Sequence, residues 1–151
     1  SAHFSMIDKV VGNNYTNEPM AFLLEDSEIQ EEIEPYIMAR IVDFEEFIRQ
    51  YPFDIISIHD DLHFIIDDPI MECNCGDFSL RWDAAGDTIL ERGGTRGETV
   101  RCDIQTLTAM FYGYKRPTYL KRVERLQAND TAVRILEDII PIEQPYFSDY
   151  F

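Results

Sequence analysis

The sequence predicts an α+β fold in which helices cover one face of a mostly antiparallel sheet. In the middle of the chain apolar and polar residues alternate, most clearly from Phe78 to Trp82, which is typical of a half-buried strand. After Asp103 the apolar residues recur at helical spacing. Strands followed by helices favour a sheet with a helical layer on one side. The connections between the strands are too short for crossover helices, so we expect an antiparallel meander.

Each element is predicted from a local pattern. Asp43 and Glu46 form a capping box in front of apolar residues at helical spacing, and Pro52 ends that helix. Gly113 ends a second helix, which begins at Ile104. Helices are expected at residues 25–34, 44–51, 104–112, 118–126 and 131–140. Strands are expected at residues 6–11, 36–42, 55–59, 62–67, 78–82, 88–92 and 98–102.

The best candidate for a domain boundary lies at Pro35, where an acid-rich segment gives way to sharper patterns. Residues 1–35 are then a connecting piece, and residues 36–151 are a domain. A chain of 151 residues, of which 45% are hydrophobic, suffices for one domain with a packed core. The chain opens at Ser1 in mid-pattern, so we expect a piece of a longer protein.

The chain has 13 basic and 29 acidic residues, a formal net charge of −16. Such a charge repels nucleic-acid phosphates and anionic membrane surfaces, so neither is an expected partner. No apolar stretch approaches membrane-spanning length, and no signal peptide is recognisable. Three cysteines are too few for a disulfide scaffold and suit reducing conditions, so we expect a cytoplasmic protein. The acid excess serves solubility or attracts a cationic ligand.

No metal site is expected. His59 and His63 would share a face only on a helix, and their β-branched surroundings favour a strand or turn. Cys73, Cys75 and Cys102 lack a partner pair at zinc-site spacing, so we interpret them as reduced thiols.

Two further motifs are interpreted as connections. Residues 93–97 are rich in glycine but lack the Lys-Ser/Thr pair of a phosphate-binding loop, so we expect a hairpin connection. The adjacent carboxylates at 60–61 and 67–68 point to opposite faces of a strand, which favours solvated turns over acid–base pairs.

The basic residues cluster at positions 115–125, where they either pair with acids of this or an adjacent chain or dock a partner. The last six residues, Tyr146–Phe151, contain four aromatic residues, although chain ends are usually polar. This terminal segment either places the carboxylate of Phe151 in a cleft as a base, or anchors itself to the flank of the domain.

Four segments together resemble one known family. They are Tyr36-Ile-Met-Ala-Arg-Ile-Val-Asp43, Phe78-Ser-Leu-Arg-Trp82, Leu107-Thr-Ala-Met-Phe-Tyr-Gly-Tyr114 and Tyr146-Phe-Ser-Asp-Tyr-Phe151. They look like the C-terminal domain of the enhanced-intracellular-survival (Eis) type acetyltransferases, which has the sterol-carrier-protein (SCP2-like) fold and follows two GNAT-like domains. The resemblance covers residues 36–151, and residues 1–35 look like the end of the second GNAT-like domain.

The resemblance implies transfer of acetyl from acetyl-CoA to a cationic amine, such as an aminoglycoside, a polyamine or a lysine. It places the acetyl-CoA site and a general-acid tyrosine in the N-terminal GNAT domain, so we expect this chain to be inactive alone. The family's terminal carboxylate, the general base, maps onto Phe151, with Asp149 and Tyr150 beside it for substrate binding. Tyr150 replaces an acidic residue of well-known members, which bears on aminoglycoside specificity. The expected partners are the preceding GNAT domains and further copies in a homo-oligomer.

Two other functions compete with acetyl transfer. One is an apolar-ligand module, whose tunnel would be lined by five residues of a strand and a helix: Phe78, Leu80, Trp82, Met110 and Phe111. The same spacing is more typical of a hydrophobic core. The other is an assembly domain that holds subunits together without a catalytic role.

Overall fold

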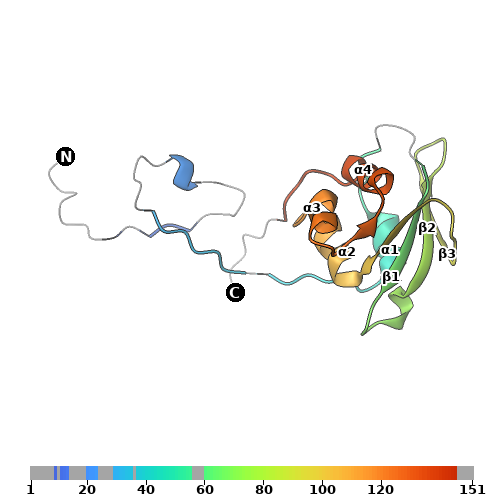
Figure 1. Cartoon of the computed structure of the whole chain (residues 1–151), viewed down its shortest axis with the longest axis horizontal. Helices are drawn as coiled ribbons and strands as arrows, with labels where there is room; N and C mark the ends of the chain where they lie inside the picture. The colour runs from blue at the N-terminus through green and yellow to red at the C-terminus, as the bar shows by residue number, and fades with distance from the viewer. Residues whose placement is uncertain are drawn as a thin grey trace. The chain divides into compact units, whose positions relative to one another are not determined.

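The computed structural model describes residues 9, 11–13, 20–23, 29–35, 37–55 and 60–145 (Figure 1). The chain divides into two units. Met38–Pro145 contains the sheet and its helices. Ser1–Ile37 and Tyr146–Phe151 form the other, whose described part contains the short 3₁₀ helix η2 (Met20–Leu23). None of the described helices has the length and apolar character needed to cross a membrane.

The α+β fold is confirmed, with the helices on one side of a five-stranded sheet (Figure 1). The strand order is β3-β2-β1-β4-β5, and three of the four pairings are antiparallel. The strands are β1 (Leu62–Asp67), β2 (Gly76–Trp82), β3 (Thr88–Arg92), β4 (Glu98–Asp103) and β5 (Gln127–Ala128).

The predicted meander is wrong at β4, which pairs with β1 in parallel. Residues 93–97 therefore form a crossing from the edge strand β3 to the far side of β1, not a hairpin. The crossing passes close to β2, where the hydroxyl of Ser79 donates to the carbonyl of Arg96 at 3.0 Å and accepts from its N–H at 2.8 Å. A Cβ on Gly94 would lie 2.7 Å from the side chain of Ser79, so this approach requires glycine.

Four helices cover the sheet: α1 (Phe44–Gln50), α2 (Ile104–Phe111), α3 (Pro117–Arg122) and α4 (Asp130–Ile139). Asp43 accepts the N–H of Glu46 at 3.0 Å, which confirms the predicted cap of α1. Asp103 caps α2 and Asn129 caps α4 in the same way. The predicted helix 118–126 is shorter than expected, because the chain turns after Arg122 and enters β5.

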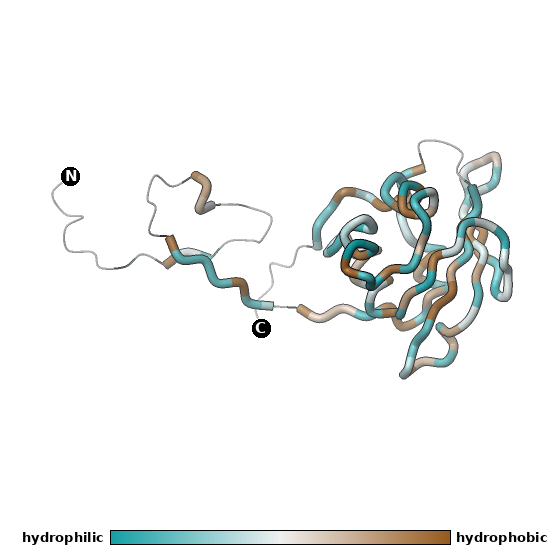
Figure 2. The backbone as a smooth tube through the Cα atoms, in the orientation of Figure 1, coloured by the Kyte–Doolittle hydropathy of each residue, from teal (hydrophilic) through white to brown (hydrophobic). Residues whose placement is uncertain are grey.

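The core lies between the helices and the sheet, where Figure 2 shows hydrophobic segments along the strands. The ring of Phe44 in α1 packs edge-on against Phe64 in β1 and Phe78 in β2, with centroids 5.8 and 5.0 Å away. All three side chains are fully buried, and each contributes about 1.5–3 kcal/mol to the stability of the fold.

Two other predicted elements are wrong within the described residues. No strand forms at residues 37–42, because the N–H of Ile41 donates to the hydroxyl of Thr108 at 3.2 Å instead of to a strand. No helix forms at 29–34, where Ile33 is 75% exposed. Ile55 is not in a strand. The rest of these segments and most of the predicted strand 6–11 lie outside the described residues.

Candidate functional site

The predicted site residues Asp149, Tyr150 and Phe151 lie outside the described residues. The structure does describe the segment that leads toward them, Ile140–Pro145, which we call the exit segment. Its path is set by groups just after α2, just before α3 and on α4. The candidate site is therefore built from the contacts that hold this segment.

Arg116 is the main anchor of the exit segment. Its guanidinium donates to the carbonyl oxygens of Ile140 at 3.0 Å and Pro141 at 3.1 Å. It also donates to the carbonyl of Glu137 at 2.9 Å and to the Glu137 carboxylate at 2.8 Å. A guanidinium presents several N–H donors in a rigid plane, so one side chain binds the end of α4 and the first two residues beyond it.

The chain holds Arg116 in this position from two sides. Arg116 is the residue before α3, and Pro117 at the first helical position stabilises the start of that helix. On α4 the carboxylate of Glu137 also accepts the N–H of Thr118 at 2.8 Å. Burial alone would raise the pKa of Glu137, but the hydrogen bonds from Thr118 and Arg116 outweigh it and lower the pKa. The ion pair is therefore charged at neutral pH.

Gly113 provides a second contact to the exit segment. It follows α2 with a φ of 74°, a conformation that favours glycine. A Cβ at this position would lie 1.8 Å from the carbonyl oxygen of Glu143, which is far inside contact distance. The exit segment therefore passes directly against the end of α2.

Tyr51, just after α1, completes this region. Its hydroxyl donates to the carbonyl oxygen of Phe111 at 2.7 Å. Burial raises the pKa of Tyr51 to about 12; the positive charge of Arg116 opposes this shift and the negative charge of Glu143 adds to it. The phenol is therefore neutral at physiological pH and serves as a hydrogen-bond donor that joins α1 to α2.

A second buried polar cluster holds the segment that leads into α1. The Asp68 side chain is fully enclosed, and one carboxylate oxygen accepts the N–H groups of Ile70 and Met71 at 3.0 Å each. The same oxygen accepts Arg40 at 2.5 Å, and the other accepts the Asn74 amide at 2.9 Å. Burial would raise the pKa of Asp68, but these four donors lower it well below its usual range.

Asn74 extends this cluster to the start of α1. Its amide donates to the carbonyl of Val42 at 3.1 Å, and its side-chain oxygen accepts the N–H of Phe44 at 2.8 Å. The interpretation of residues 67–68 as a solvated turn is wrong for Asp68, because Asp68 is buried whereas Asp67 is exposed. Polar contacts thus fix both ends of the folded unit, and those of Asp68 and Asn74 are the more deeply buried.

Neither anchor is signalled by a local sequence pattern. The burial of Asp68 does not follow from residues 67–68, because its four donors are two backbone N–H groups and the side chains of Arg40 and Asn74. Arg116 belongs to the basic cluster of the sequence. Proline is common at the first position of a helix, so Pro117 is the local signal that Arg116 lies at a helix start.

No group of three or more His, Cys, Asp or Glu side chains in the described part of the chain is placed to hold a metal ion. His63 pairs instead with Asp77, with 2.6 Å between Nε2 and Oδ1. All three cysteines are free thiols. Burial and, to a lesser extent, the negative charge of Asp103 both raise the pKa of Cys102. His59 lies outside the described residues.

The five candidate tunnel residues belong to the core or pack against it. Phe78, Leu80, Met110 and Phe111 are at most 3% exposed, and Trp82 is partly buried beside Phe53. A groove of about 410 Å³ does lie over residues 40–52, but it is open to solvent and has charged residues along it.

Comparison with known proteins identifies this fold. Residues 44–148, more than half of the chain, match the family described as the sterol carrier protein domain. The chain belongs to this family. No curated protein matches the sequence of this sterol carrier protein domain.

Three solved structures are similar to this sterol carrier protein domain. A conserved protein of unknown function from Enterococcus faecalis V583, a probable N-acyltransferase, has 32% identity over 78% of this chain and 29% of its own, with a TM-score of 0.70. A GCN5-related N-acetyltransferase from Anabaena variabilis has 28% identity over 70% of this chain and 26% of its own, with a TM-score of 0.60. Another GCN5-related N-acetyltransferase, from Kribbella flavida, has 22% identity over 74% of this chain and 28% of its own, with a TM-score of 0.61. At this identity the similarity shows the fold alone. The chain spans less than a third of the length of each.

Proposed function

We propose that this domain is the C-terminal part of a GNAT-type N-acetyltransferase of the Eis type, and that the carboxylate of Phe151 completes its active site. Similarity to larger proteins described as N-acyltransferase and N-acetyltransferase supports the reaction class. The anchoring of the exit segment by Arg116 supports the proposal for this chain, because it holds Ile140 and Pro141, the first two residues beyond α4 on the way to the chain end.

The chemistry assigned to the chain end follows from its charge. A carboxylate beside a protonated amine favours its binding and then takes a proton from the ammonium nitrogen. The neutral amine attacks the carbonyl carbon of the acetyl thioester, the carbon–sulfur bond breaks, and the leaving thiolate takes a proton from a general acid. Because a free terminal carboxyl has a low pKa, Phe151 is an effective base only where it is removed from water. Asp149 and Tyr150 are proposed to contact the amine.

The remaining parts of the site are proposed to belong to the GNAT domains that precede residue 36 in the same protein. They would bind acetyl-CoA and supply the acid. The formal net charge of −16 favours cationic amines over anionic acceptors, so aminoglycosides, polyamines and lysine side chains are the proposed substrates in a cytoplasmic homo-oligomer.

An apolar-ligand function gains no support from the geometry. Two of the side chains that would line a tunnel pack against neighbouring aromatic rings: Phe111 lies 5.0 Å from Tyr51, and Trp82 lies 5.3 Å from Phe53, measured between ring centres. A ligand would have to displace these contacts.

The test is an acetyl-transfer assay on the full-length protein. Consumption of acetyl-CoA is measured with polyamines, aminoglycosides and lysine peptides, for the wild type and for a variant that lacks Phe151. We expect activity with at least one amine and its loss in the variant, while circular dichroism shows the same fold. Full activity without Phe151 would refute the carboxylate role, and no activity with any amine would refute the acetyltransferase assignment.

A further inference from the structure

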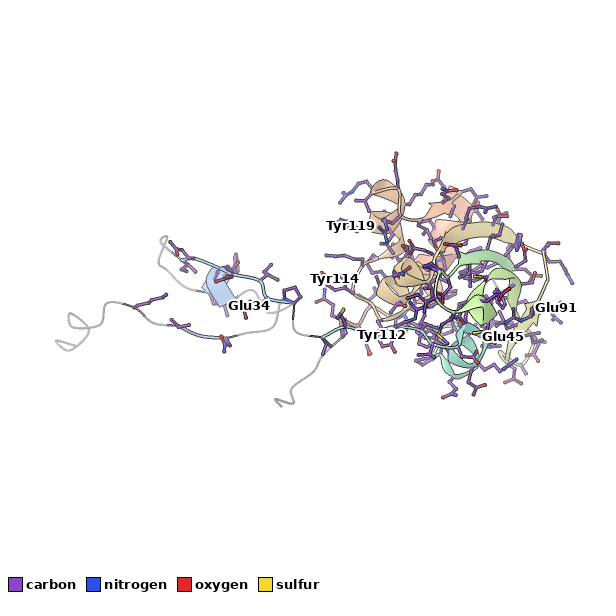
Figure 3. All side chains as sticks on the ribbon, turned by 90° about the horizontal axis from the view of Figure 1, so that it is seen from below. Glu34, Glu45, Glu91, Tyr112, Tyr114 and Tyr119 are labelled. Atoms are coloured by element: carbon purple, nitrogen blue, oxygen red, sulfur yellow. The ribbon has the colours of Figure 1, made fainter. Side chains whose placement is uncertain are left out.

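A patch of tyrosines and cations on and beside α3 has no part in the proposed reaction. It consists of Tyr114, Lys115, Tyr119 and Arg122, which we call the α3 patch. Tyr114 is 61% exposed and Tyr119 is 39% exposed. Figure 3 shows both tyrosines, with Tyr112, along one side of the domain, and Glu45 and Glu91 on the other.

The other cations of the basic cluster are paired within the domain. Arg116 pairs with Glu137, Lys121 with Asp130 at 2.6 Å, and Arg125 with Asp103 at 3.2 Å. The sequence left open whether the five basic residues of this cluster pair with acids or dock a partner. Three of the five pair with acids of the same chain.

Lys115 and Arg122 differ from these three residues. Neither forms a salt bridge with a carboxylate in the described part of the chain. The Lys115 ammonium instead lies 4.6 Å from the ring centre of Tyr114 and 5.2 Å from that of Tyr119. The Arg122 guanidinium lies 5.3 Å from the ring centre of Tyr119. The rings hold the two cations in place and leave their charge uncompensated.

Such a patch suits a peptide with carboxylates on either side of an apolar side chain. The carboxylates would meet the two cations, and the apolar group would cover the tyrosine rings. A chain with this much negative charge offers few complementary surfaces to an acidic segment.

The chain itself carries such a segment at Glu31–Glu34, where three glutamates flank Ile33. All four residues are exposed and lie outside any helix or strand, and Ile33 is 75% exposed. We propose that the α3 patch of one copy binds the Glu31–Glu34 segment of a second copy. Two copies that exchange this segment form the same contact twice about a two-fold axis, so that the second contact strengthens the first.

Sedimentation equilibrium on the full-length protein tests this contact with two charge-reversed variants. One carries Lys115→Glu and Arg122→Glu, and the other carries Glu31→Lys, Glu32→Lys and Glu34→Lys. Each variant alone is expected to associate about tenfold more weakly than the wild type, because like charges then face each other. Mixed together, the two variants regain association, since the reversed patch of one now matches the reversed segment of the other.

Arg49→Glu is the control, because Arg49 is an exposed cation on α1 that pairs with Glu45 and lies outside the patch. It is expected to associate like the wild type, and raising the salt from about 0.05 to 0.5 M is expected to weaken wild-type association. A wild type with the mass of one copy at every concentration, variants that associate normally, or a mixture that regains nothing would each overturn the proposal. Lys115→Gln with Arg122→Gln, which avoids reversed charge, repeats the test if the reversed patch fails to fold.

Discussion

Arg116 donates to the carbonyl oxygen of Pro141 at 3.1 Å, five residues before the aromatic chain end begins at Tyr146. Because the same guanidinium binds Glu137 on α4, the start of the exit segment is tied to that helix. Arg116 therefore fixes the first two residues of the exit segment against α4. This relationship joins the fold to the proposed function.

Gly113→Ala is expected to displace the exit segment, because its Cβ would collide with the carbonyl of Glu143 at 1.8 Å. The loss of stability is expected to be about 2–4 kcal/mol, since steric conflict adds to the strain of a positive φ. Urea unfolding followed by tryptophan fluorescence measures it.

Gly86→Ala is the matched control for this substitution. Gly86 also has a positive φ, of 87°, but a Cβ there would meet nothing within 4 Å. Its cost is expected to be about 1 kcal/mol, from backbone strain alone. Equal losses at the two positions would show that the contact between Gly113 and the exit segment has no energetic importance.

Asp68→Asn is expected to destabilise the domain by about 2–4 kcal/mol, because Arg40 loses its anionic partner and the buried donors lose a charged acceptor. The measurement is the urea midpoint at constant m-value. Asp67→Asn, at the exposed neighbouring position, is expected to stay within about 0.5 kcal/mol of the wild type. A neutral effect at Asp68 would mean that the cluster does not hold the segment before α1.

Stability is expected to fall as the pH is lowered from about 5 to 2. The pKa values of Asp68 and Glu137 are lower in the folded protein than their usual values, so the unfolded chain binds protons first. Their contribution is complete above the unfolded pKa and is lost as the pH falls through the folded pKa. Urea midpoints across this range should decline less steeply for Asp68→Asn than for the wild type, and identical slopes would exclude Asp68 as a cause.

Local chemistry explains which elements were predictable. The cap of α1 depends on Asp43 and Glu46, which lie three residues apart, and the alternation in β2 places Phe78 and Leu80 in the core, although Ser79 between them is buried as well. Both signals are complete within a few residues. The run before Asp43 also alternates, but it forms no strand. Ile41 is buried and its N–H donates to Thr108, while Met38 is fully exposed, so here the alternating pattern belongs to an irregular segment.

Distant contacts explain what was not predictable. The parallel pairing of β1 and β4 depends on the crossing at residues 93–97, whose close passage by Ser79 links positions far apart in sequence. The anchor at Arg116 likewise needs α4 to place Glu137 beside it. The assignment of Phe151 came from family resemblance, and it stays a prediction.

Acetyl transfer by the full-length protein in a double-mutant cycle tests the central claim most directly. Arg116→Met alone is expected to lower kcat by about tenfold to a hundredfold, because the terminal carboxylate is misplaced, and deletion of Phe151 alone is expected to lower it at least as much. If Arg116 acts by positioning Phe151, Arg116→Met causes no further loss once Phe151 is absent. Losses that multiply in the double variant would contradict the account, because Arg116 would then act independently of the chain end.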